Sequence, residues 1–269
     1  MQMIWHELKS NLKGLIGWTI AVIIFQLSGY SKYQGFAAAE SSNSLNSITN
    51  VFPPALQALF GMSNLNIGTL IGYFGILYVY FALMGCIYSG LLGANIIAKE
   101  ERDKTSEFLY TRPVSRNKAL TAKVTVGNFN SVFLWAVIVI SSIIGVAITN
   151  SYHFSLSGQV MQMMWGILLM QIFFFCLGMF FAGLFKRPKL PTTAITISIV
   201  GAYFLAAFAD LNVSLNWLRF FTPFRWFSAP SIINTGHVAL GYTVLAIIFS
   251  LVLITFGFVL FDRRDITVG

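Results

Sequence analysis

The chain has 269 residues, of which 57% are hydrophobic and 10% are charged, and its formal net charge is +8. Soluble globular domains carry roughly 25% charged residues, so this composition excludes an ordinary soluble protein. The positive charge does not indicate nucleic-acid binding, because the basic residues lie at the ends of apolar segments, where the loops of membrane proteins carry them. We therefore expect membrane lipid around the chain and no nucleic acid as a partner.

Six apolar segments are long enough to cross the membrane as helices, since a crossing takes roughly 20 residues. The stretch 124–185 contains no Asp, Glu, Lys or Arg and is about twice as long as one crossing needs, so its polar run TNSYHFSLSG is interpreted as a turn. The sequence predicts an all-α polytopic membrane protein, a single transmembrane domain over 1–269. The expected spans are 14–30, 67–98, 124–148, 160–185, 191–209 and 238–261.

Lysine and arginine are divided unequally between the two sides of these spans. Fourteen of the seventeen fall on the side that holds both termini, and only Lys32, Arg219 and Arg225 fall on the other. Because cytoplasmic loops carry the excess of basic residues, we expect both termini in the cytoplasm and the protein in the plasma membrane.

The first 13 residues are amphipathic if they are helical, with Ile4, Trp5, Leu8 and Leu12 at helical spacing and charged residues on other faces. Two interpretations of this segment stay open. It could form an interfacial helix that lies on the membrane, or a cytoplasmic extension of the first span. The predicted fold includes the N-terminal interfacial helix.

The two predicted outer loops, 31–66 and 210–237, differ in composition. In the first, Pro53 and Pro54 can open a short helix, since proline is tolerated in the first turn. The second contains the run NWLRFFTPFRWFSAPSII, which is too aromatic for an ordinary solvated loop. We interpret it as a pair of re-entrant helices in the outer leaflet, broken at Pro223, and the alternative is an interfacial helix packed on the bundle.

The segment 99–123, KEERDKTSEFLYTRPVSRNKALTAK, concentrates the charge of the protein. It holds seven of the seventeen basic residues and four of the nine acidic ones, so it lies outside the lipid. Within it, Phe108, Leu109 and Tyr110 form an apolar triplet beside charges. The triplet lies at the end of a predicted short helix, which Pro113 terminates. Such a triplet suits a groove on a soluble partner, and it suits the lipid headgroup region equally well.

The sequence contains no pattern for chemistry of its own. It has no Walker A or GxGxxG pattern, and His6, His153 and His237 are isolated. Cys86 and Cys176 both lie in apolar segments, and no span carries the internal carboxylate typical of a proton or cation pathway. We predict no catalytic residue, no metal site and no cofactor in this chain, and the energy for any transport must come from a partner.

Four stretches in chain order resemble the ABC-2-type transporter permeases: VFPPALQALFG, EERDKTSEFLYTRPVSRNKALTAK, FTPFRWFSAPSII and FDRRDITV. The resemblance covers most of the chain, although Lys104 stands where the family often has glycine. It implies half of an exporter membrane domain, paired with a second permease, either another copy or a paralogue. It also implies two ABC ATPase subunits that bind ATP and Mg.

The same resemblance implies a cytoplasmic coupling helix within 99–123. By position, Glu107, Phe108 and Leu109 would insert into the ATPase, and Glu100 and Glu101 would lie at the helix end that transmits movement. Two arginines are further candidates for this contact, Arg112 and Arg116.

The leading functional hypothesis is an export permease for a drug, peptide, lipid or similar substrate. The alternative is a membrane assembly or immunity factor that binds a partner without transport. The sequence does not indicate which residues bind the substrate.

Overall fold

The computed structural model describes residues 2–35, 38, 52–63, 65–102, 116–149, 158–211, 217–218 and 220–262. These residues form helices and connecting turns, and no strand occurs among them. The helices are α1 (Gln2–Ser31), α4 (Pro54–Leu59), α5 (Leu70–Arg102), α7 (Arg116–Ile148), α8 (Gly158–Leu184), α9 (Leu190–Leu211), α10 (Pro223–Trp226), α11 (Ala229–Thr235) and α12 (Leu240–Asp262).

Six of the helices, α1, α5, α7, α8, α9 and α12, are long and apolar enough to cross a membrane. Each overlaps one predicted span, so the predicted all-α fold with six membrane-spanning helices is confirmed. Several helices continue past the apolar segments: α5 runs to Arg102 and α7 begins at Arg116. Lys, Arg and Glu are good helix formers, so the charged residues that mark the end of a span do not end the helix.

Helix α1 is continuous from Gln2 to Ser31. This is the arrangement that one of the two interpretations described, in which the amino-terminal residues extend the first span. The position of this extension relative to the lipid surface stays a prediction.

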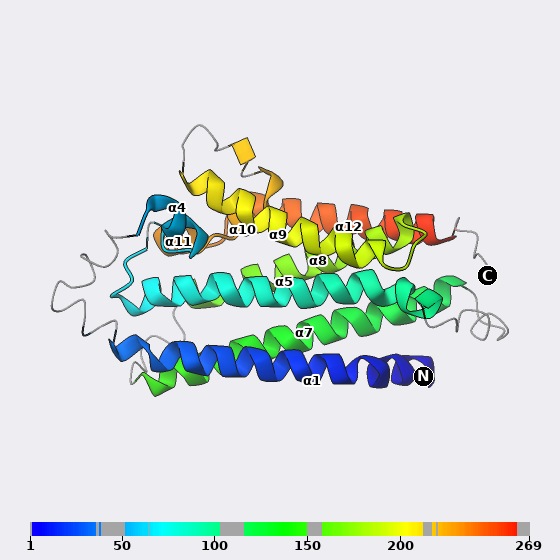
Figure 1. The fold of residues 1–269 in the computed structure, drawn as a ribbon, viewed down its shortest axis with the longest axis horizontal. Helices are drawn as coiled ribbons and strands as arrows, with labels where there is room; N and C mark the ends of the chain where they lie inside the picture. Colours follow the sequence, from blue (N-terminus) through cyan, green and yellow to red (C-terminus); the bar gives the residue numbers. More distant parts are fainter. Residues whose placement is uncertain are drawn as a thin grey trace.

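The six long helices run along a common direction (Figure 1). The start of α1 and the finish of α12 lie at the same end of the bundle, called here the terminal end, and the opposite end is called the distal end. Helix α8 packs most extensively against α5 and α12, and α1 packs mainly against α7. Helices α5 and α8 therefore form the centre of the bundle.

Glycines bring the backbones of α5 and α8 into contact. A Cβ atom on Gly178 of α8 would collide with the carbonyl oxygen of Gly90 of α5, and one on Gly93 would collide with the carbonyl oxygen of Phe175. Helices in lipid associate largely by close packing, which small residues permit. These glycines therefore set the separation of the two central helices.

Candidate functional site

Two short helices connect α9 to α12. Proline opens α10 at Pro223, where its fixed φ suits a first helical turn and no N–H donor is needed. The chain leaves helical geometry at Phe227, and Gly236, with a φ of 76°, ends α11 in the left-handed region that favours glycine. The structure thus has two short helices in this loop, separated at Phe227 and Ser228, and the chain is also extended at Thr222 just before Pro223. Their re-entrant position stays a prediction.

Aromatic side chains pack these short helices between the long ones. The rings of Trp226 and Phe173 of α8 have centroids 5.7 Å apart, and Trp226 also stacks on Tyr242 and Phe249 of α12. The hydroxyl of Tyr78 donates a 2.7 Å hydrogen bond to the carbonyl oxygen of Phe227. Because Tyr78 lies about 12 Å along α5 from its distal start, α10 and α11 lie beside the bundle helices rather than beyond their ends (Figure 1).

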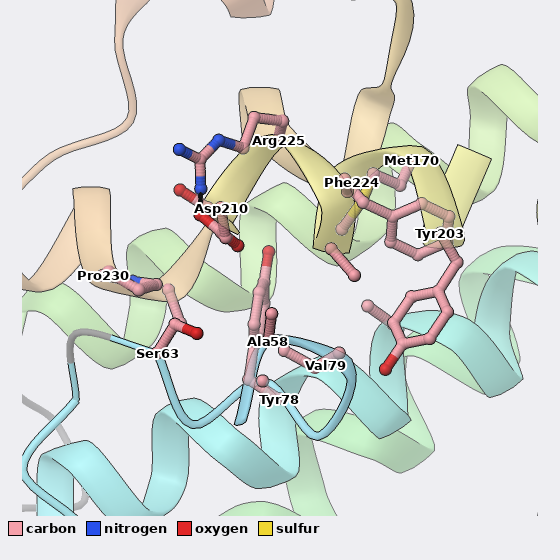
Figure 2. A pocket seen from close by; sticks show the side chains of 16 residues that line it. Ala58, Ser63, Tyr78, Val79, Met170, Tyr203, Asp210, Phe224, Arg225 and Pro230 are labelled. Atoms are coloured by element: carbon pink, nitrogen blue, oxygen red, sulfur yellow. Dashed lines mark ion pairs between the residues drawn. The ribbon is translucent and has the colours of Figure 1, made fainter. Parts of the chain in front are cut away.

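A cavity of about 60 Å³ lies against the short helices at the distal end, and α4, α5, α8 and α9 complete its walls. Figure 2 shows the side chains of Asp210 and Arg225 pointing toward one another at this cavity, where they form an ion pair. Burial lowers the pKa of Arg225 from its usual value, but a guanidinium group remains charged in proteins. The pair therefore fastens the end of α9 to α10.

The size of this cavity limits what it can bind. A water molecule needs about 10–15 Å³ measured in the same way, so there is room for a few waters. Drug-sized ligands occupy pockets of about 300–1,000 Å³. Among the described residues, no group of three His, Cys, Asp or Glu side chains could hold a metal ion. The cavity is thus a small space with a mostly apolar lining, and it does not have the size of a substrate site.

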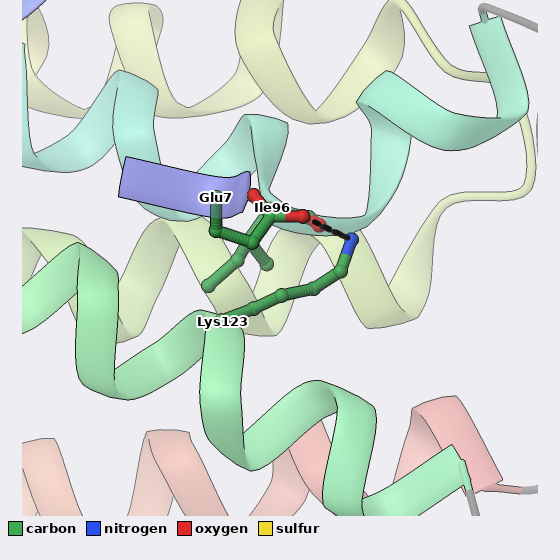
Figure 3. A network of polar contacts seen from close by, with 3 residues as sticks. All are labelled: Glu7, Ile96 and Lys123. Atoms are coloured by element: carbon green, nitrogen blue, oxygen red, sulfur yellow. Dashed lines mark hydrogen bonds and ion pairs between the residues drawn. The ribbon is translucent and has the colours of Figure 1, made fainter. Parts of the chain in front are cut away.

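At the terminal end, Lys123 of α7 joins three helices (Figure 3). Its Nζ atom donates a 3.0 Å hydrogen bond to the carbonyl oxygen of Ile96 of α5 and lies 3.7 Å from the carboxylate of Glu7 of α1. The lysine is only 6% exposed, and a buried charge requires such partners. The contact ties α1, α5 and α7 together near the terminal end.

The predicted coupling residues lie at this end or outside the described residues. Glu107, Phe108, Leu109 and Arg112 fall within 103–115, which the structure does not describe. Glu100 and Glu101 lie in the last turns of α5, and Arg116 begins α7, so their backbone positions share the terminal end. Their roles stay predictions.

The contact between Glu7 and Lys123 was not predicted from the sequence. One signal was present, since Glu7 is the only acidic residue among the first 39. Its partner could not be identified, because the register of α1 against α7 is set by packing and not by any local pattern.

A family profile described as "ABC-2 family transporter protein" matches residues 1–266. The chain belongs to the ABC-2 transporter family. No curated protein matches the chain. Membership identifies the protein as a multi-pass membrane permease subunit of an ABC transporter, and not as its nucleotide-binding enzyme. The resemblance found in the sequence motifs is thus confirmed.

Proposed function

We propose that the permease exports a drug, peptide, lipid or similar substrate across the plasma membrane, using ATP hydrolysed by a separate subunit that holds the ATP and Mg. The observation that carries this proposal is the family match over 1–266 on a chain with six helices able to cross a membrane. A second permease, identical or paralogous, completes the membrane domain. The excess of basic residues on the side of the termini supports a cytoplasmic terminal end.

The coupling to the ATPase is assigned to the segment between α5 and α7. Glu107, Phe108 and Leu109 form the coupling helix, Glu100 and Glu101 transmit its movement, and Arg112 and Arg116 add contacts. The family resemblance of this segment supports the assignment. The hydrogen bond from Lys123 to α5 and its proximity to Glu7 support a further step, in which displacement of 103–115 moves α1, α5 and α7 together.

Transport then follows from a difference in affinity between two states. ATP draws two ATPase subunits together, and the paired subunits bind the coupling segments better in one arrangement of the helix bundles than in the other. A ligand shifts such an equilibrium only by its differential affinity for the two states. Substrate is released on the side where the distal ends of the bundles open.

At the distal end, α10 and α11 lie in the outer leaflet as re-entrant helices. Their packing along α5 and α8, through the bond from Tyr78 to Phe227 and the ring contact of Trp226 with Phe173, supports this position. A solvated loop would leave these aromatic residues in water.

The test is purification of the tagged permease from native membranes in a mild detergent, followed by mass spectrometry and an ATPase assay. We expect a soluble subunit with a Walker A sequence and vanadate-sensitive turnover. Phe108→Asp should abolish its binding without preventing membrane insertion, since the new charge cannot enter an apolar groove. Phe154→Asp, in the segment that follows α7 and precedes α8 in the sequence, is the matched control and should retain the subunit.

Two results would contradict the proposal at different levels. Complete retention of the complex by Phe108→Asp would show that the coupling assignment is wrong. Failure to find or reconstitute any ATPase partner would favour the alternative, a membrane assembly or immunity factor.

A further inference from the structure

Three buried polar side chains without hydrogen-bond partners lie at one level of the bundle. Ser89 of α5, Asn130 of α7 and Gln171 of α8 are each at most 1% exposed. Among the described residues, the hydroxyl of Ser89 and both amide ends of Asn130 and Gln171 have no partner. In the hydrocarbon region there is no bulk water to satisfy such groups, so each unpaired atom is strongly unfavourable.

Ser89 lies on the face of α5 that packs against α8. Gly85, Ser89 and Gly93 are spaced four residues apart and so lie along one face of α5. A Cβ atom on Gly85 would collide with the side-chain amide of Gln171, and one on Gly93 would collide with the backbone of Phe175. Ser89 therefore lies between the two α5 residues that contact Gln171 and Phe175.

Helix α7 brings Asn130 to the same level. A Cβ atom on Gly127 would collide with the ring of Phe175. Asn130 lies one turn from Gly127 toward the distal end, and Gln171 lies one turn from Phe175 in the same direction, because α7 and α8 run opposite ways. The unpaired side chains of three helices thus converge at one level, one turn beyond the ring of Phe175.

The amide of Gln26 shows that pairing is achieved elsewhere in this bundle. Gln26 of α1 is fully buried, and its amide nitrogen donates to the carbonyl oxygen of Ile138 at 3.4 Å. Its amide oxygen accepts hydrogen bonds from Ser141 and Ser142 of α7. The buried amide of Gln26 thus has partners, whereas the buried amides of Asn130 and Gln171 have none among the described residues.

The chemistry of this level favours a small neutral ligand. The residues 67–98 and 124–185, which supply all three side chains, contain no Asp, Glu, Lys or Arg. A charged ligand would be left without a counter-charge, which is costly in this environment. Water can donate and accept at once, and a buried water typically makes about three hydrogen bonds to otherwise unsatisfied groups. We propose that Ser89, Asn130 and Gln171 form a binding site for a small cluster of water molecules at the centre of the bundle.

Two further hydroxyls extend the site toward α1. The hydroxyl of Tyr88 and that of Thr19 are also buried and without a partner among the described residues. The rings of Tyr88 and Trp18 have centroids 6.0 Å apart, which places α1 beside this part of α5. Water-mediated bonds are nearly as favourable as direct ones, so the cluster would join α5, α7 and α8 without requiring side chains of exact length.

The test is hydroxyl-radical footprinting of the full-length permease in lipid nanodiscs, with X-ray pulses given at several delays after mixing with H₂¹⁸O. Radicals formed from bound water label the side chains beside it, so we expect labelling of Phe175 with slow entry of ¹⁸O. Phe81, which is equally buried two turns away on α5, should stay unlabelled. Asn130→Leu should lose the labelling of Phe175.

Gln26→Leu is the matched control, since it removes a buried amide that already has partners, and labelling of Phe175 should be unchanged. Gln171→Met, which keeps the length of the side chain, serves as a second variant if Asn130→Leu fails to fold. The proposal is overturned if Phe175 is labelled no more than Phe81, or if neither site variant changes its labelling. It is also overturned if Na⁺ raises the Tm of the wild type but not of the site variants, because the oxygen atoms would then bind a cation.

Discussion

Helices α8 and α12 lie side by side and are both apolar along their length, yet they occupy different environments. Fourteen of the 27 residues of α8 are buried, whereas only three of the 23 residues of α12 are, so α8 is central and α12 peripheral. Lipid tails are as apolar as leucine. The apolar character of a helix therefore indicates that it lies in the membrane, but it does not indicate which helices pack against it. The two helices differ in what surrounds them: Gly178 and Gln171 of α8 lie against α5, whereas α12 exposes large aliphatic side chains such as Leu251.

The largest expected effect comes from adding one methyl group at the centre. In Gly178→Ala the new Cβ atom would collide with the carbonyl oxygen of Gly90 and lie 2.8 Å from the backbone nitrogen of Ala94. Backbone atoms of a packed helix cannot move cheaply, so we expect a loss of about 3 kcal/mol or more in the free energy of unfolding. Denaturant titration in detergent measures it.

The control for this substitution is Gly241→Ala on α12, where a Cβ atom would meet nothing within 4 Å. The free energy of unfolding should stay the same or rise by up to about 1 kcal/mol, because alanine is a better helix former than glycine. Equal destabilisation by both substitutions would refute the view that close contact with α5 distinguishes α8.

We expect a smaller loss of stability from a substitution in α10, at the residue that contacts both α8 and α12. Trp226 is 5% exposed and packs against Phe173 of α8 and Phe249 of α12. Trp226→Ala should lower the free energy of unfolding by about 2 kcal/mol, less than the ~3–5 kcal/mol of a soluble core, because lipid can partly replace the lost contacts.

Trp217→Ala provides the matched comparison, since Trp217 is 59% exposed. Its effect should stay within about 0.5 kcal/mol, as is usual for surface positions. If the two tryptophan variants were equally stable, the α10 contacts would not hold α8 and α12 together.

The sequence predicted the number and approximate positions of the spans because charged residues are excluded from lipid. It did not predict which spans are central, because burial in protein and exposure to lipid select the same aliphatic residues. Asn130 and Gln171 were not predicted as site residues, because neutral amides within long apolar runs match no charged or metal-binding pattern. The partner of Lys123 depends on the register of α1 against α7, which no local pattern specifies. The coupling residues Glu107, Phe108 and Leu109 lie outside the described residues, and their assignment rests on resemblance.

The smallest expected effect lies on the outward face of α12. Leu251 is 60% exposed in the isolated chain, so lipid or detergent contacts it both when the helix is packed and when it is separated. Leu251→Ala should therefore change the free energy of unfolding by no more than about 0.5 kcal/mol, because the hydrophobic effect does not favour burial of leucine over its exposure to lipid. Thermal unfolding at two protein concentrations measures this. A large loss that grew on dilution would mean that another chain covers this face, and α12 would then be central in the assembly although it is peripheral in the single chain.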